Sequence, residues 1–149
     1  NLLLVANVSN RAEREYLESV KAVLTSKNVR VLQNVKNLIM PGILNAARPG
    51  VFVLLAKYGE GVPRAMLEAM GVGLVPVVTP VGAIPDVIRS GYNGFIVRSR
   101  EEALEVIEKL LSDDSLLERL SNNAVMTVRE KHTLDYFSKS LLRLLYQLS

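Results

Sequence analysis

The chain has no cysteine and only a single histidine among its 149 residues, and both facts limit the class of protein it can belong to. Without cysteine there is no disulfide framework, so a cytoplasmic setting is the simplest expectation. The lone histidine, His132, stands just before an expected helix start, and we interpret it as structural or solvent-exposed. No metal site is therefore expected.

Long apolar runs are also missing. The longest stretches are Leu2–Ala6, Val51–Ala56 and Gly71–Val78, far shorter than the roughly 18 residues that span a bilayer. No basic stretch precedes Leu2–Ala6, so no signal peptide is indicated. The chain opens on Asn1 rather than methionine and enters an apolar run at once, which we interpret as a fragment of a longer protein.

Charge of one sign is not concentrated anywhere. The 18 Lys and Arg residues are spread among 15 Asp and Glu residues, for a net charge of +3. This mild excess suits an acidic ligand, but it lacks the basic stripe that tracks a nucleic acid, so no nucleic-acid partner is expected. With 49% hydrophobic and 22% charged residues, the composition is that of a globular domain rather than a disordered chain.

Short apolar runs alternate with amphipathic segments, a pattern that predicts an α/β fold with a Rossmann-like parallel sheet and helices on both faces. Two capping boxes, Ser99–Glu102 and Ser115–Glu118, mark helix starts. No linker or repeat interrupts the chain, so one domain is expected. The expected strands are Leu2–Ala6, Arg30–Leu32, Val51–Leu55, Val75–Val78 and Phe95–Val97, and the expected helices are Arg11–Leu24, Met40–Ala47, Pro63–Met70, Ile84–Arg89, Arg100–Leu111, Ser115–Arg129 and Thr133–Leu148.

The stretch from Tyr58 to Met70 carries the strongest functional signal. Glu60 and Glu68 lie eight residues apart where a glycine-marked loop turns into a helix. Pro63 suits the first helical position, and the N–H groups of Arg64 and Ala65 are then free to hold an anion such as a diphosphate. The two carboxylates can accept hydrogen bonds from hydroxyls at separate points of one extended ligand, such as a sugar or a ribose.

In a parallel sheet the ligand lies outside the carboxyl ends of the strands, so the loops there are expected to line the site. Asn7–Asn10 follows the first strand, and asparagine enters the left-handed region at modest cost. Gln33–Val35 follows the second strand. Thr79–Ala83 follows the fourth, and its Gly82 allows close approach of the backbone.

Four motifs in this order and spacing resemble the C-terminal, nucleotide-sugar-binding domain of the group-1 retaining glycosyltransferases (family 4), which have the GT-B fold. The resemblance runs almost without a gap from Val51 to Val97. The motifs are Glu60 to Glu68 followed by Ala69–Gly73, then Pro76–Thr79, Gly82–Ile88 and Gly91–Val97.

The resemblance implies transfer of a sugar from a nucleotide diphosphate sugar with retention at the anomeric carbon, with no metal and no cofactor besides this donor. Glu60 would contact hydroxyls of the transferred sugar as the catalytic candidate, and Glu68 would bind the ribose hydroxyls. The remaining expected ligand contacts are the backbone of Gly61 and Val62 at the sugar, that of Arg64 and Ala65 at the diphosphate, Gln33 at the nucleobase, and the loop with Thr79 and Gly82.

Several positions depart from the family pattern and leave the donor's identity open. The family's phosphate-binding Arg and Lys would lie upstream of Leu2 and are absent. The family's usual Gly-Leu-Pro-Val-Val reads Gly73-Leu-Val-Pro-Val-Val78, with the proline displaced by one. Ala83 replaces a common second glycine, Asp86 a common glutamate, Leu55-Ala56 a frequent Pro-Ser, and Gly50 a frequent aspartate.

The resemblance also implies a domain organisation: residues 1–149 as the donor-binding domain, without its first strand and without the N-terminal acceptor domain. That missing domain would bind an acceptor sugar or lipid, and the full-length enzyme could associate with a membrane surface. The fragment alone is expected to be inactive. The apolar face of Thr133–Leu148 is expected to be partly exposed and to favour self-association.

Other interpretations remain open. The chain could be a non-catalytic α/β nucleotide-sugar-binding or regulatory module, whereas the Glu60–Glu68 spacing disfavours an epimerase or a phosphorylase. Glu60 could simply favour a helix start electrostatically, and Glu68 could be a solvated helical residue. Gly91 and Gly94 are best interpreted as turn residues. The Arg64 side chain suits a phosphate or solvent equally. Met66, Leu67 and Met70 are interpreted as core.

Overall fold

A computed structural model describes residues 2–6, 8–23, 29–36, 38–59 and 61–147. The chain forms two compact units, Asn1–Ile43 and Leu44–Ser149.

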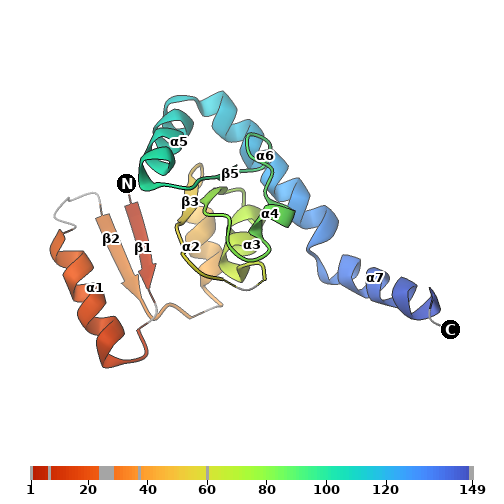
Figure 1. Ribbon diagram of the computed structural model, residues 1–149, viewed down its shortest axis with the longest axis horizontal. Coiled ribbons are helices and arrows are strands. Elements are labelled where there is room, and N and C mark those ends of the chain that lie inside the picture. Colours follow the sequence, from red (N-terminus) through yellow and green to blue (C-terminus); the bar gives the residue numbers. More distant parts are fainter. Residues whose placement is uncertain (1, 7, 24–28, 37, 60, 148–149) are drawn as a thin grey trace. The chain divides into compact units, whose positions relative to one another are not determined.

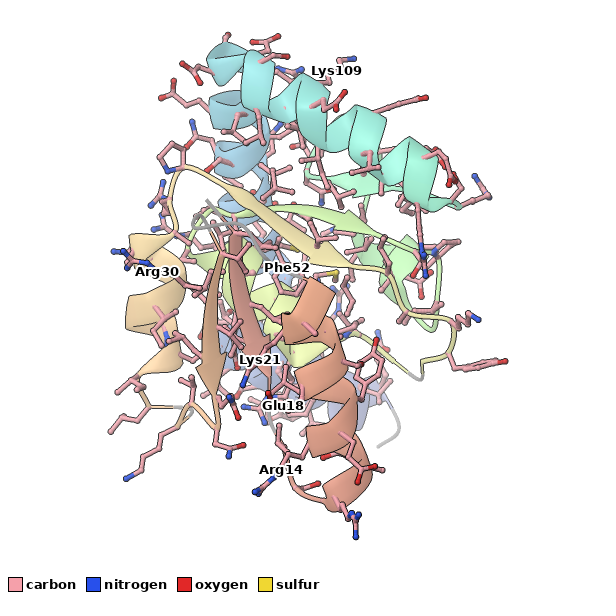
Figure 2. All side chains as sticks on the ribbon, turned by 90° about the vertical axis from the view of Figure 1, so that its left-hand side faces the viewer. Arg14, Glu18, Lys21, Arg30, Phe52 and Lys109 are labelled. Atoms are coloured by element: carbon pink, nitrogen blue, oxygen red, sulfur yellow. The ribbon has the colours of Figure 1, made fainter. Side chains whose placement is uncertain are left out.

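The first unit is a strand–helix–strand arrangement of β1 (Leu2–Ala6), α1 (Arg11–Val23) and β2 (Val29–Gln33). The two strands pair in parallel, from Leu2 opposite Val29 to Ala6 opposite Gln33. Asn10 caps α1, since its side-chain oxygen accepts the Glu13 N–H at 2.9 Å. On the same helix Lys21 donates to Glu18 at 2.8 Å, and both side chains are labelled in Figure 2.

The second unit holds a three-stranded parallel sheet with the order β3-β4-β5, in which β4 is central. The helix α2 precedes it and spans the division between the units. The bounds are α2 (Met40–Ala46), β3 (Val51–Leu54), α3 (Arg64–Gly71), β4 (Val75–Val78), α4 (Ile84–Val87), β5 (Phe95–Ile96), α5 (Arg100–Ser112), α6 (Asp114–Lys131) and α7 (Leu134–Gln147).

The core of the second unit lies on both faces of β4. Val75 and Val77 pack in one cluster with residues of α5 and α6, whereas Val78 packs in the other cluster with residues of α3 and α4. Phe52 of β3, labelled in Figure 2, packs against this second cluster. Figure 1 shows α3 and α5 on opposite sides of the strands. The predicted α/β architecture, with parallel strands and helices on both faces, is confirmed.

Pro76 stands in the central strand, where proline removes a backbone donor. Val75 N–H donates to Gly50 O at 3.0 Å and Thr79 N–H to Leu54 O at 3.2 Å, so these donors face β3. Backbone donors alternate along a strand, so the donor of residue 76 would face the other neighbour. There β5 begins only at Phe95, opposite Val77, and the displaced proline therefore costs no sheet hydrogen bond.

Gly94 is the residue that makes room for this proline. A Cβ at position 94 would lie 2.5 Å from Pro76 Cγ and 2.7 Å from Pro76 O. Gly91 has a φ of 78°, and its N–H donates to Gly94 O at 2.9 Å. Both glycines therefore serve the turn that leads into β5, as the sequence predicted.

The structure differs from the predicted elements in several places. The helix α6 starts at Asp114 rather than Ser115, because Asp113 caps it by accepting the Leu116 N–H at 2.9 Å. The predicted helix Ile84–Arg89 ends at Val87, where Ile88 becomes extended. The Ser99 cap is confirmed, since its hydroxyl accepts the Glu102 N–H at 3.0 Å.

The last helix, α7, has no buried residue. Leu134 is 86% exposed and Phe137 63% exposed, so the expected exposed apolar face is confirmed for the part of α7 that the structure describes. Self-association through this face stays a prediction, and Leu148 lies outside the described residues.

Asn93 is 1% exposed and stabilises the turn after α4 through three side-chain hydrogen bonds. Its Oδ1 accepts the Arg89 N–H at 2.8 Å, and its Nδ2 donates to Val87 O at 2.9 Å and to Thr127 Oγ1 of α6 at 3.0 Å. A single buried amide thus joins the turn to a helix 34 residues away in sequence.

We expect Asn93→Ala to lower the free energy of unfolding by about 2–4 kcal/mol, because it removes three hydrogen bonds and leaves their partners unsatisfied. Denaturant unfolding measures this loss. The control is Asn122→Ala, an exposed position on α6, which should change stability by less than about 0.5 kcal/mol. A loss at Asn93 no larger than at Asn122 would contradict this role.

Candidate ligand-binding site

The start of α3 is shaped by Pro63. This residue is the N-cap, with φ −62° and ψ 122°, and its carbonyl accepts the N–H groups of Met66 at 3.1 Å and Leu67 at 3.2 Å. The helix therefore begins at Arg64, one residue later than predicted, because the proline ring fixes φ and leaves ψ free to be extended. The N–H groups of Arg64 and Ala65 precede these first helical bonds and stand at the positive end of the helix dipole, which favours an anion.

The core fixes how α3 is turned about its axis. Met66, Ala69 and Met70 are fully buried, and Leu67 packs against the same cluster. This confirms that Met66, Leu67 and Met70 are core residues. Because the buried positions recur at helical spacing, Arg64, Ala65 and Glu68 are left on the exposed face.

On that face the side chain of Arg64 pairs with the carboxylate of Glu68. The Nη2–Oε1 distance is 3.6 Å, and the two side chains are 84% and 41% exposed. An exposed ion pair at this spacing contributes about 0.3–0.5 kcal/mol. Both groups therefore remain available to a ligand at little cost.

Two loops meet at the carboxyl end of β3 and β4. The Thr79 hydroxyl donates to Ala56 O at 2.6 Å, and the Ala83 N–H donates to Gly61 O at 2.9 Å. Gly82 has a φ of +55°, and a Cβ there would lie 2.6 Å from Gly61 O. Ala83 has an ordinary φ of −95°, which explains why an alanine can replace the family's second glycine.

Most of the candidate residues from the sequence lie at this edge of the sheet or on the first turns of α3. Their contacts with a ligand stay predictions. They are Gly61, Val62, Arg64, Ala65, Glu68, Thr79 and Gly82.

Two candidates are not placed with them. Glu60 lies outside the described residues. Gln33 is exposed at the end of β2, in the first unit. Beside it, Asn34 adopts a left-handed φ of 51° and its side chain accepts the Val8 N–H at 2.8 Å, so the loops after β1 and β2 meet.

Sequence reasoning missed the contacts that Ala56 and Ala83 make through their backbones. Their side chains carry no chemical signal, and only Gly82 indicated close approach here. In the part of the chain that the structure describes, no cluster of three or more His, Asp or Glu residues could hold a metal ion. None of the described helices is both long enough and apolar enough to cross a membrane.

The architecture defines a class of protein: its α/β fold matches the C-terminal half of GT-B glycosyltransferases. The structure of HepE from Anabaena in complex with UDP has a TM-score of 0.81 at 18% identity, over 97% of this chain and 40% of that one. The C-terminal domain of a glycosyl transferase group 1 family protein from Francisella tularensis has a TM-score of 0.62 at 23% identity, over 83% and 63% of the two chains.

The family follows from the sequence comparison. Residues 3–126 match the model of the glycosyl transferases group 1 family, and the chain belongs to this family. A sucrose synthase from Melioribacter roseus is 38% identical over 105 residues, which are 66% of this chain and 13% of that protein. The chain thus spans a small part of this relative's length.

His132 has a structural place at the end of α6. Its N–H donates to Val128 O at 2.9 Å and closes the helix. Partial burial, and to a lesser degree the positive charge of Lys131, lower the pKa of His132 below its usual range. The neutral ring is therefore the form that the folded protein favours.

We expect this histidine to make the folded state less stable in acid. In the unfolded state His132 takes up a proton at its ordinary pKa of about 6.5, and in the folded state its pKa is lower. Its contribution to the free energy of unfolding is therefore present above about pH 6.5 and is lost as the pH falls through the lower pKa of the folded state. Urea unfolding at a series of pH values should show a steeper loss between about pH 7.5 and pH 5.5 for wild type than for His132→Gln. Parallel curves would contradict the assignment.

Proposed function

We propose that this chain is the donor-binding half of a retaining glycosyltransferase, which transfers a sugar from a nucleotide diphosphate sugar to an acceptor. The observation that carries the proposal is the exposed start of α3, where two backbone N–H groups at the positive end of the dipole stand one helical turn from the Glu68 carboxylate. Four residues of helix cover about 6 Å, a separation suited to a phosphate and the hydroxyls of its ribose.

Each part of the donor has a proposed partner. The diphosphate binds the N–H groups of Arg64 and Ala65, and Glu68 accepts hydrogen bonds from the ribose hydroxyls. The sugar lies beside the backbone of Gly61 and Val62, and Glu60 contacts its hydroxyls as the catalytic candidate. The backbone at Gln33 serves the nucleobase. In support, HepE has been solved with UDP-glucose at a TM-score of 0.77 to this chain.

The chemistry proposed for this half is stabilisation of the leaving group. As the bond from sugar to phosphate breaks, negative charge grows on the diphosphate, and oriented N–H groups at a helix start offset it without reorganising. In this scheme the start of α3 needs no metal ion to do so.

The acceptor, a sugar or a lipid, would be bound by a further domain of the protein. The exposed apolar face of α7 is the surface that such a domain would cover. We place the enzyme in the cytoplasm, where the full-length protein could act at a membrane surface.

The first test is the affinity for UDP. We expect Glu68→Gln to weaken UDP binding about tenfold, or about 1.4 kcal/mol, because a neutral amide replaces a charge-assisted acceptor of the ribose hydroxyls. Calorimetry on the full-length natural protein measures this. Glu105→Gln, on the exposed side of α5, is the matched control and should bind as wild type does. If Glu68→Gln also leaves the affinity unchanged, the ribose role is wrong.

The second test separates the two glutamates. We expect Glu60→Gln to leave the affinity for UDP within about twofold and to weaken UDP-glucose by about tenfold, because the proposed partner of Glu60 is the sugar alone. The same calorimetric experiment with both ligands measures it. Equal losses for UDP and UDP-glucose in both variants would contradict the division of roles, and a wild-type protein that binds neither ligand would contradict the proposed function.

A further inference from the structure

The parallel pairing of β3 and β4 continues beyond the ends of the strands. The last strand pair is Leu54 opposite Val78. Directly after it, the Thr79 N–H donates to Leu54 O at 3.2 Å and the Thr79 hydroxyl donates to Ala56 O at 2.6 Å. The side chain of Thr79 thus supplies the next connection between the two chain segments.

The two loops stay close further along. Gly59 lies beside Val81, since a Cβ built on Gly59 would lie 3.3 Å from Val81 Cγ2. The Ala83 N–H donates to Gly61 O at 2.9 Å. The loop after β4 runs alongside the loop that leads into α3.

Gly82 lets these backbones come together. A Cβ at position 82 would lie 2.6 Å from Gly61 O, 3.1 Å from Gly59 O and 3.1 Å from Gly61 N. These are backbone atoms, so no flexible side chain can move aside. The positive φ of Gly82, +55°, adds strain for any other residue.

We infer that Thr79 and Gly82 are positioning residues: they hold the segment around Gly61 in place for the sugar of the donor. The inference rests on the proposed function. Met66 and Met70 anchor the start of α3 in the core, and Val62 and Val81 pack against the same cluster. The contacts of Thr79 and Gly82 are made with Ala56, Gly59 and Gly61, so their loss should affect the loop before α3 more than the start of the helix.

The first experiment removes only the hydroxyl. Thr79→Val keeps the branched shape of the side chain, and Thr79→Ser keeps the hydroxyl. In the full-length natural protein we expect Thr79→Val to leave the calorimetric affinity for UDP within about twofold and to weaken UDP-glucose at least fivefold, with Thr79→Ser close to wild type. Equal weakening of both ligands, or of neither, would overturn the inference.

The second experiment needs no ligand. Amide hydrogen exchange in Thr79→Val should become at least tenfold faster at Ala83, whose N–H donates to Gly61 O, and stay unchanged at Leu67 and Met70. Unchanged exchange at Ala83 would overturn the inference without touching the proposed function. Conversely, failure of the wild-type protein to bind UDP would contradict the proposed function. The exchange rates would then still test whether the two loops contact each other.

The third experiment makes the same substitution, glycine to alanine, at two different positions. Gly82→Ala should reproduce the selective loss of UDP-glucose affinity to a greater degree than Thr79→Val. Gly71→Ala is its control, since a Cβ there meets only Val128 Cγ1 at 3.7 Å, and both affinities should match wild type. If Gly82→Ala is too unstable to study, Thr79→Val and the exchange rates decide. A folded Gly82→Ala protein with wild-type affinity for both ligands would overturn the inference.

Discussion

The burial of β4 on every side is the constraint on which the second unit depends. All four of its residues are buried, β3 and β5 pair with its two edges, and a separate apolar cluster covers each face. Burying a large aliphatic side chain stabilises a fold by about 1.5–3 kcal/mol, so this strand is held firmly in place and fixes the positions of the segments that adjoin it. Its carboxyl end passes directly to Thr79 and the loop beyond.

The candidate ligand-binding site beside this strand consists mainly of backbone groups. The apolar side chains of α3 turn the helix so that its first N–H groups and Glu68 face outward, and the loop around Gly82 lies against the loop around Gly61. Such a site depends on chain geometry and on a few side chains. The fold matches that of HepE at only 18% identity, so this architecture tolerates wide change in residue identity.

Local patterns predicted much of this fold. Val75–Val78 was correct to the residue because a short run of apolar residues after a helix and glycines is typical of a buried parallel strand. The start of α3 was misplaced by one residue, since the φ of Pro63 suits both a cap and a first helical position. The start of α6 was wrong because Asp113 and Ser115 are both good caps, and only the structure shows which one accepts a bond.

Long-range contacts could not be predicted in the same way. Asn93 stands in a segment typical of a tight turn, and its partner Thr127 lies on a distant helix. The Thr79 hydroxyl donates to Ala56 O, a carbonyl that no side-chain pattern singles out.

The central claim is that an anionic nucleotide binds at the start of α3. The most direct measurement is a titration of the ¹⁵N-labelled protein with UDP, followed by the backbone amide signals in NMR. The account predicts that the largest shifts occur at Arg64 and Ala65, with smaller shifts at Gly61 and Glu68 and none at Leu110 and Leu117 in the core beneath α5. Shifts that spare Arg64 and Ala65 and concentrate on α5, α6 or α7 would contradict it.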